Sequence, residues 1–402
     1  MFKRKLEENL LYCVKRNIYK KYRVLIKYNN FSDKIISKIE KSNGTVYSSL
    51  KHICLICAEV KSLTLNRLIE MPEVTYVCFD DYCHICASPI GIEPANGLRF
   101  SHNYKLCGKN ISIALIDTGV YPHKDLTEPV NRIIYFNDII NNIHYPYDDN
   151  GHGTFIAGIM CGSGLYCNNM YKGLATKSNL YVYKCFDAKG KGFVSDILYA
   201  LDIIIDMYEE ANIKIICLAA EYLSYNSFII NAFNDMFKKC CDKNIIVVVP
   251  SGSSKNSDCS IKGFATSKYC LTIGGYDTYK TDKPYEYSSS GPYLKLTKPE
   301  FVAAASNITS LNSDVTFVSE RRGIKLYPSK LEKLYTVYSG TSCSSAYICS
   351  IIALLFEDNI NLTFNDILSL FKLSAVSPDI NKEYVTKNMV GYGLIDPTQI
   401  LK

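Results

Sequence analysis

The 402-residue sequence contains no tryptophan, only six histidines and no long apolar run. A helix that crosses a bilayer needs about 20 consecutive apolar residues, so the sequence argues against a membrane-spanning protein. Residues 1–21 are rich in Lys, Arg and Glu and lack the apolar stretch of a secretory signal peptide. We therefore expect a cytoplasmic protein, with non-classical export as an alternative.

A large excess of charge of either sign is also missing. The chain has 45 Lys and Arg against 39 Asp and Glu, a net charge of +6, which is small for this length and does not indicate nucleic-acid binding. We find no internal repeat and no low-complexity linker. Because 48% of the residues are hydrophobic, we expect a folded globular chain. Its length of 402 residues predicts two domains, or one large α/β domain with an appendage.

Cysteine, by contrast, is abundant, with 17 residues. In a large chain without an export signal, we expect most of them to be reduced and buried as small hydrophobic side chains. The alternative is a zinc site, because Cys54 with Cys57 and Cys83 with Cys86 form two CxxC pairs. The gap between the pairs exceeds the usual zinc-ribbon spacing, and both lie in β-like apolar runs. The spacing therefore favours an absence of metal.

Residues 22–88 are predicted to form a small domain, between a charged segment at 1–21 and a larger domain at 89–402. Their patterns follow the order strand, helix, strand, strand, helix, strand, which is the split ferredoxin-like βαββαβ arrangement. The predicted strands are 22–28, 45–50, 53–60 and 74–79, and the predicted helices are 32–41 and 63–70.

From residue 109 onward, short β-branched strands alternate with helix-length segments. This alternation predicts an α/β fold, with a mostly parallel sheet covered by helices on both faces. Two polar segments, 141–150 and 306–338, are predicted to be long loops that shape a substrate site. The predicted strands are 111–116, 180–183, 213–218, 245–249 and 270–273, and the predicted helices are 154–161, 195–210, 227–243 and 344–357.

Three short segments of the larger domain place an acid, a base and a hydroxyl in chain order. Asp117 ends an apolar strand, at the edge where open α/β sheets have their sites. His152 lies between two glycines before an apolar helix, and Ser342 lies before another, whose first N–H groups favour a developing negative charge. The segments are Ile113-Ala-Leu-Ile-Asp-Thr-Gly119, Asn150-Gly-His-Gly-Thr154 and Ser339-Gly-Thr-Ser-Cys-Ser344.

These residue types fit nucleophilic catalysis. A hydroxyl attacks a carbonyl poorly at neutral pH unless a histidine takes its proton, and that histidine needs a buried carboxylate to hold its tautomer. We therefore predict Asp117, His152 and Ser342 as the catalytic residues. In this order and with these flanking residues, the chain resembles a subtilisin-like serine protease, a member of the subtilase family.

The resemblance covers about residues 22–397 and implies an endopeptidase that acts on polypeptides. It implies that an acyl-enzyme forms on Ser342 and is then hydrolysed by water. It also implies that the ferredoxin-like unit is a prodomain, which serves as folding template and intramolecular inhibitor, and that self-cleavage takes place near residues 83–89. We expect the enzyme to have a narrow specificity, as a processor of one precursor does.

Two segments depart from the family's pattern. Ser253 stands where the family has an asparagine whose amide completes the oxyanion hole. The alternatives are that Ser253 is a weak donor, that Asn256 reaches into the site, or that the enzyme is slow. Ala219, Ala220 and Glu221 replace the residues that pair with the bound peptide, a pairing that uses main-chain groups. The Glu221 carboxylate would either select a basic residue before the cleaved bond or narrow the cleft.

A second class of function stays open, that of a catalytically weak pseudo-protease that binds or regulates with its cleft blocked by the prodomain. No cofactor is required by the resemblance. In some relatives an aspartate at the position of Asp125 joins a calcium site, but the other ligands are not legible in this sequence. The Lys-, Asn-, Ile- and Tyr-rich composition is similar to that of clostridial members, some of which act in spore germination, so spore association is an alternative location.

Overall fold

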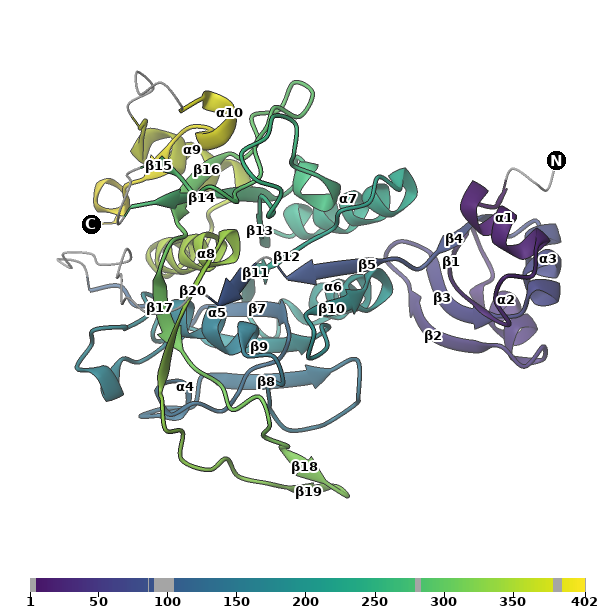
Figure 1. Ribbon diagram of the computed structural model, residues 1–402, viewed down its shortest axis with the longest axis horizontal. Coiled ribbons are helices and arrows are strands. Elements are labelled where there is room, and N and C mark those ends of the chain that lie inside the picture. The colour runs from purple at the N-terminus through teal and green to yellow at the C-terminus, as the bar shows by residue number, and fades with distance from the viewer. Residues whose placement is uncertain (1–4, 86, 90–104, 279–282, 379–384, 402) are drawn as a thin grey trace.

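The computed structural model describes residues 5–85, 87–89, 105–278, 283–378 and 385–401. They form a small N-terminal domain beside a larger α/β domain, and a strand runs from the small domain across the face of the larger one (Figure 1). No helix within these ranges is long and apolar enough to cross a membrane.

The small domain is a four-stranded antiparallel sheet in the order β2-β3-β1-β4, covered on one face by helices. Successive side chains of a strand point to opposite faces, and β1 is buried on both. Val24 and Ile26 pack against the helices, whereas Leu25 packs against the α/β domain. The βαββαβ prediction is confirmed, with β1 at Tyr22–Tyr28, α2 at Ser32–Glu40, β2 at Thr45–Leu50, β3 at Leu55–Val60, α3 at Ser62–Glu70 and β4 at Val74–Phe79.

One more helix, α1 (Glu8–Lys15), lies in the charged N-terminal segment. Its buried side chains Leu10 and Val14 join the core that α2 and α3 share with the sheet. Leu6, just before this helix, bridges to Val77 of β4. The described part of the segment therefore packs as part of the small domain.

The larger domain is built on a 10-stranded sheet, and the seven strands from β8 to β16 run parallel. Helices α5 and α8 cover one face, and α6 and α7 cover the other, toward the small domain (Figure 1). The predicted α/β fold class is confirmed. In sheet order, the strands of the parallel part are β16 (Phe301–Ala304), β14 (Leu271–Asp277), β13 (Ile246–Pro250), β11 (Ile213–Leu218), β7 (Ser112–Asp117), β9 (Asn179–Lys184) and β8 (Ile133–Asp138).

The sheet edge beyond β16 is made of short strands near the C-terminus. β22 pairs with β16 in parallel and with β21 in antiparallel orientation, and β15 pairs with β14. The helices are α4 (Lys124–Thr127), α5 (His152–Cys161), α6 (Val194–Met207), α7 (Ser227–Asp242), α8 (Thr341–Asp358), α9 (Phe364–Ser374) and α10 (Lys387–Val390), and the edge strands are β15 (Lys283–Pro284), β21 (Ala375–Val376) and β22 (Leu394–Ile395).

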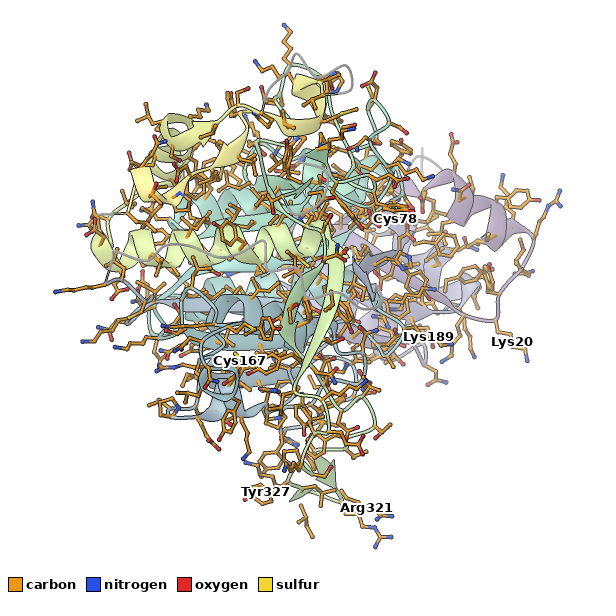
Figure 2. All side chains as sticks on the ribbon, turned by 60° about the vertical axis from the view of Figure 1, so that its left-hand side comes forward. Lys20, Cys78, Cys167, Lys189, Arg321 and Tyr327 are labelled. Carbon is orange, nitrogen blue, oxygen red and sulfur yellow. The ribbon has the colours of Figure 1, made fainter. Side chains whose placement is uncertain are left out.

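The prediction of one long loop over 306–338 is wrong. The segment holds β17 (Ile308–Leu311), which pairs with β20 (Tyr335–Gly340), and a hairpin of β18 (Glu320–Arg321) and β19 (Ile324–Lys325). These strands of two to six residues are too short for a periodic pattern to identify. Figure 2 shows Arg321 and Tyr327 at the tip that this hairpin forms.

The connection between the domains is extended. β5 (Tyr82–Ile85) is the middle strand of a three-stranded sheet, antiparallel to both β10 (Lys191–Phe193) and β12 (Ala220–Glu221). A few residues on, β6 (Ala87–Pro89) pairs antiparallel with β20. We call residues 80–85 and 87–89 the tail of the small domain. The tail therefore lies across the α/β domain in an extended conformation.

The cysteines behave as small hydrophobic residues wherever they are described. All of those are free thiols, and most are buried. Over the described ranges, no group of three or more His, Cys, Asp or Glu side chains is arranged to hold a metal ion. Cys86, the last member of the two CxxC pairs, lies outside the described residues.

Candidate active site

Asp117 and His152 form a buried pair where β7 ends and α5 begins. Oδ1 of Asp117 accepts from Nδ1 of His152 at 2.7 Å and from the backbone N–H of Thr118 at 2.7 Å. An ionised carboxylate only accepts hydrogen bonds, so Nδ1 carries a proton and Nε2 of the neutral ring carries the lone pair. Nε2 has no hydrogen-bond partner among the described residues. The pair therefore presents a base.

The glycines on either side of His152 are required by the backbone. Gly151 caps α5 with a φ of 97°, in the left-handed region that favours glycine. At position 153 a Cβ atom would lie 2.0 Å from the carbonyl oxygen of Gly119. The Gly-His-Gly sequence thus lets the start of α5 approach the end of β7, which brings His152 to Asp117.

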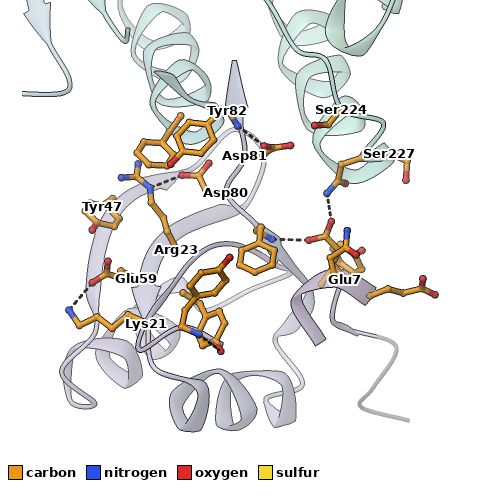
Figure 3. A pocket seen from close by; sticks show the side chains of 18 of the residues that line it. Glu7, Lys21, Arg23, Tyr47, Glu59, Asp80, Asp81, Tyr82, Ser224 and Ser227 are labelled. Atoms are coloured by element: carbon orange, nitrogen blue, oxygen red, sulfur yellow. Dashed lines mark hydrogen bonds and ion pairs between the residues drawn. The ribbon is translucent and has the colours of Figure 1, made fainter. Parts of the chain in front are cut away.

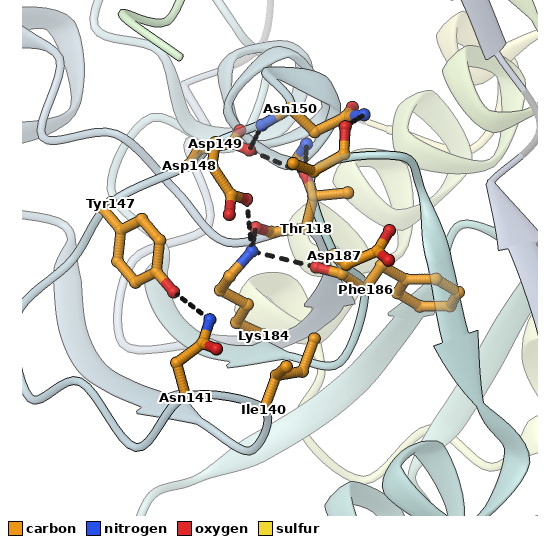
Figure 4. Close-up of polar contacts among 12 residues, drawn as sticks. Thr118, Ile140, Asn141, Tyr147, Asp148, Asp149, Asn150, Lys184, Phe186 and Asp187 are labelled. Atoms are coloured by element: carbon orange, nitrogen blue, oxygen red, sulfur yellow. Dashed lines mark hydrogen bonds and ion pairs between the residues drawn. The ribbon is translucent and has the colours of Figure 1, made fainter. Parts of the chain in front are cut away.

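Asp148 is a positioning residue that we did not predict. It lies in the predicted polar loop 141–150, yet its side chain is fully buried. It accepts from Thr118 Oγ1 at 2.8 Å, from the N–H of Gly151 at 2.8 Å, and from both N–H and Oγ1 of Thr154 at 2.8 and 2.6 Å. It ties the turn after β7 to the first turn of α5 (Figure 4). The sequence carries no signal for this role, because a single acid in a polar loop is usually solvated.

A buried lysine supports the same region. Lys184, at the end of β9, is fully buried, and its Nζ donates to the carbonyl of Thr118 at 2.6 Å and to Asp149 at 2.6 Å. A third bond goes to the carbonyl of Phe186 at 2.9 Å. Figure 4 shows this ammonium between the turn after β7 and the loop before α5. A buried charge persists when it is paired and hydrogen-bonded, and Lys184 is both.

Ser342 is the second residue of α8 and is fully buried. Its Oγ donates to the carbonyl of Ala219 at 3.2 Å, and not to His152. No side chain caps this helix, because Gly340 occupies the N-cap position. The first N–H groups of α8 are therefore available to a developing negative charge. α8 packs against α5, so the helices that hold Ser342 and His152 in their first turns are neighbours.

The two predicted oxyanion donors are both engaged elsewhere. Ser253 donates its backbone N–H to Oε2 of Glu221 at 2.9 Å and its Oγ to Oε1 at 2.6 Å. Asn256 donates its amide to the carbonyl of Tyr285 at 3.0 Å. Glu221 is itself buried, and a Cβ at Gly252 would lie 2.8 Å from its Oε2. Its carboxylate thus forms a compact pair with Ser253.

The tail of the small domain passes directly over this site. On one side, Ile85 pairs with Ala220, which follows Ala219, the residue whose carbonyl accepts the hydrogen bond from Ser342. On the other side, Ala87 pairs with Gly340, two residues before Ser342. A cavity of about 370 Å³ is lined by His152 together with His84 and Ile85 of the tail. The main chain on either side of position 86, which itself lies outside the described residues, therefore flanks Ser342.

The predicted substrate segment, Ala219 to Glu221, is where this pairing takes place. Ala220 and Glu221 pair with Ile85 and His84 in antiparallel register. Across the tail, Lys191 pairs with His84, and the N–H of Ile85 donates to Gly190 at 3.2 Å. Both edges of the tail are thus held by main-chain bonds, as in the β-addition of a peptide.

Asp125 lies away from this strand. Its carboxylate accepts from Ser163 Oγ at 2.9 Å, from the N–H of Tyr166 at 3.3 Å and from the hydroxyl of Tyr335. The carboxylate therefore connects α4 to the segment after α5 and to β20.

A mostly parallel α/β sheet with a buried Asp–His pair and a serine at a helix start defines a chain of the subtilisin-like class. The chain belongs to the subtilase family, whose model matches residues 108–393. The serine protease AprX of Bacillus subtilis is 31% identical over 279 residues, which are 66% of this chain and 61% of AprX. The minor extracellular protease Epr of the same organism is 24% identical and covers 92% of this chain and 53% of Epr.

Among solved structures, the chain is similar to fervidolysin from Fervidobacterium pennivorans, a keratinolytic enzyme related to subtilisin. The TM-score is 0.72 at 19% identity, and the match covers 95% of this chain and 61% of fervidolysin. This likeness concerns the fold. The chain spans less than two thirds of the length of each of these three relatives.

Proposed function

We propose that this chain is a serine endopeptidase in its precursor form. The observation that carries the proposal is the buried bond between Asp117 and His152 next to an extended strand bound over Ser342. In the first step, His152 Nε2 takes the Ser342 hydroxyl proton while Oγ attacks the peptide carbonyl carbon. Asp117 holds the ring in the required tautomer and stabilises the imidazolium that forms.

The tetrahedral intermediate then collapses. The imidazolium of His152 gives its proton to the leaving amine, the C–N bond breaks, and the acyl group stays on Ser342. Water attacks the acyl-enzyme, with His152 again as the base, which frees the acid and restores the serine. The oxyanion is stabilised by the N–H groups at the start of α8. Side chains and main chain supply every role, so the reaction needs no metal or other cofactor.

The first substrate is the chain itself, and we propose the bond between Cys86 and Ala87. The described strands end and resume on either side of this position, at Ile85 and Ala87. Ile85 pairs with Ala220, whose neighbour Ala219 accepts from Ser342, and Ala87 pairs with Gly340, two residues before Ser342. The proposed bond lies within the predicted window 83–89. Before cleavage the small domain is the intramolecular inhibitor, and after cleavage it is a prodomain that keeps β5 in the cleft without a covalent link.

Glu221 and Ser253 affect both the expected rate of the enzyme and the shape of its substrate cleft. Since both Ser253 donors are bound to Glu221, the oxyanion relies on the main chain of α8. In subtilisin, loss of one side-chain donor lowers kcat by about 10²–10³-fold, so we expect a slow enzyme. Both carboxylate oxygens of Glu221 already accept hydrogen bonds from Ser253, so they are not free to bind a basic side chain of a substrate. The residue before the proposed bond, Cys86, is also uncharged. We therefore favour a narrowed cleft over selection of a basic residue.

The test compares the wild-type protein with Ser342→Ala by intact mass, N-terminal sequencing and fluorophosphonate labelling. Wild type should yield a new N-terminus at Ala87 and a label on Ser342. The variant should stay at full length and unlabelled. A wild-type chain that stays intact and unlabelled after long incubation would identify the pseudo-protease instead.

A further inference from the structure

The tail contacts the α/β domain through side chains upstream of the cleft as well as through its main chain. The ring of Tyr82 stacks on Phe193, with centroids 4.5 Å apart and planes at 30°. Lys191 Nζ lies 3.4 Å from the centroid of the Tyr82 ring. Stacked rings and a cation over a ring are each favourable, and here one ring has both partners.

The preceding residue is held by a buried hydroxyl. Tyr222 is 1% exposed, and its hydroxyl donates to Oδ2 of Asp81 at 3.0 Å. Burial, together with the Asp81 charge, raises the pKa of Tyr222, so its hydroxyl stays protonated and donates. The carbonyl of Asp81 also accepts from the N–H of Val194 at 2.9 Å. Figure 3 shows Asp81 and Tyr82 side by side where the small domain meets the α/β domain.

The residue before this pair, Asp80, is held differently. Its carboxylate accepts from Ser195, through the N–H at 3.0 Å and Oγ at 2.7 Å, but also from Arg23 Nε at 2.7 Å. Arg23 lies on β1 and also pairs with Asp196 at 3.0 Å. The Arg23 contact of Asp80 therefore comes from the folded small domain and is lost to a free peptide, although the Ser195 contacts come from the α/β domain. Those of Asp81 and Tyr82 come from the α/β domain alone, so any extended peptide in the same register can reproduce them.

We propose that Lys191, Phe193 and Tyr222 form a subsite for an acidic residue followed by an aromatic residue in protein substrates. Counted back from the bond proposed above, Tyr82 is the fifth residue and Asp81 is the sixth. The inference rests on the proposed function and names its substrate class: chains with an acidic–aromatic pair at these two positions.

The subsite is continuous with the cleft. Phe193 and Lys191 belong to β10, the strand that pairs with the tail up to its third residue before the bond. A groove of about 1060 Å³ adjoins it and is lined by Asp81, Tyr82 and Phe193 among others (Figure 3). When the small domain leaves, the Phe193 ring loses the Tyr82 stack and the Arg23 guanidinium, which lies 3.6 Å from its centroid. An aromatic side chain of a substrate can then replace Tyr82.

The experiment uses the self-processed protein, freed of its small domain, and synthetic peptides kept under reductant. One peptide has the sequence of residues 81–89, and the second carries Asp81→Ala and Tyr82→Ala. The core from Cys83 onward is identical, so both should be cleaved at one bond. We expect kcat/KM to be about tenfold lower for the second peptide, mainly through KM, because the upstream contacts bind rather than react.

Enzyme variants locate the effect. Tyr222→Phe removes only the hydroxyl and should abolish the part of the preference that depends on Asp81. Tyr327→Phe is the matched control, since Tyr327 is 79% exposed at the hairpin tip, away from this groove, and the variant should leave the preference unchanged. Equal kcat/KM for the two peptides would overturn the subsite while the proposed function stands. If neither peptide is cleaved and Ser342 takes no fluorophosphonate, the proposed function fails and the subsite with it.

Discussion

At the residue scale, the role that we propose for Asp117 is to fix which nitrogen of His152 acts as the base. An asparagine keeps the size but can donate its amide N–H to Nδ1, which puts the proton on Nε2. We expect Asp117→Asn to lower kcat by about 10⁴-fold with little change in KM, measured on a cleavable peptide. Circular dichroism should show an unchanged fold. A loss of less than tenfold would contradict the role.

The pair of Glu221 and Ser253 leads to a second prediction at this scale. In Ser253→Asn, the new amide still has the Glu221 carboxylate as its nearest acceptor, so we expect little gain in kcat. In the double variant with Glu221→Gly, the amide is released toward Ser342. We expect the double variant to regain about tenfold or more of the activity that one side-chain donor supplies, measured as kcat on one peptide. Equal activity of the single and double variants would show that Glu221 does not restrain residue 253.

Chemistry-bearing residues were the most predictable part of the site. Asp117, His152 and Ser342 stand in short motifs whose flanking glycines reflect close backbone approach, and such motifs are visible in a sequence. Asp148 and Lys184 are not, because an acid in a polar loop and a lysine at a strand end are usually solvated. Their burial depends on the packing of β7, β9 and α5 against one another, which only the folded chain reveals.

At the scale of elements, the approach of α5 to the end of β7 depends on Gly153. A Cβ there would lie 2.0 Å from a backbone oxygen, which cannot move aside as a side chain can. We expect Gly153→Ala to lower the free energy of unfolding by about 1–3 kcal/mol or more. The measurement is denaturant unfolding in a Ser342→Ala background, which prevents self-digestion.

Gly323→Ala serves as the control. That glycine lies between β18 and β19 with nothing within 4 Å of its hypothetical Cβ, so only the strain of its φ of +78° remains. We expect a cost of about 1–2 kcal/mol from this strain alone, less than in Gly153→Ala. Similar losses in both variants would show that crowding at Gly119 is not the cause.

The helices and strands are predicted from the periodicity of hydrophobic residues alone, and the structure shows which of them this periodicity can identify. Strands such as 22–28 and 213–218 were found at the predicted residues because buried β-branched runs are distinctive. β17 and β20 were missed, since strands this short exist only through their partners. The pairing of β5 with β10 and β12 joins segments more than a hundred residues apart, and no local pattern encodes it.

At the scale of the whole molecule, several carboxyl groups lie at the interface between the two domains. Burial raises the pKa of Asp196 to about 6, with Arg23 opposing the rise and Asp80 adding to it. Burial also raises the pKa of Asp80, against Arg23 and Ser195. Glu7, which accepts from Asn226 of the α/β domain at 2.8 Å, has its pKa raised by burial too.

Raised carboxyl pKa values mean that docking of the small domain takes up protons. The small domain therefore binds the α/β domain most strongly below about pH 4, where these carboxyl groups are protonated whether it is bound or free. Its free energy of binding weakens as the pH rises through about 4–6 and stays weakened above about pH 6. We expect the cleaved small domain to bind about tenfold or more weakly at pH 8 than at pH 5. Size-exclusion chromatography of a fully processed sample, split and exchanged to the two pH values, measures this.

Asp196→Asn is the matched control, because its amide cannot titrate and the pH dependence should flatten. Stronger binding of the small domain at pH 8 than at pH 5 would contradict the direction of pH dependence derived from these carboxylates.

The strand laid over Ser342 belongs to the same chain as Ser342, and this has a kinetic consequence. Its local concentration is set by the tether and does not fall on dilution. We expect the first cleavage to follow first-order kinetics with one half-life at every protein concentration, measured by intact mass over a hundredfold dilution. After that cut the peptide link is gone, so dilution alone should then free the enzyme. If the proposed function holds, a cell could thus accumulate this protein in inactive form for as long as its concentration keeps the two cut parts together.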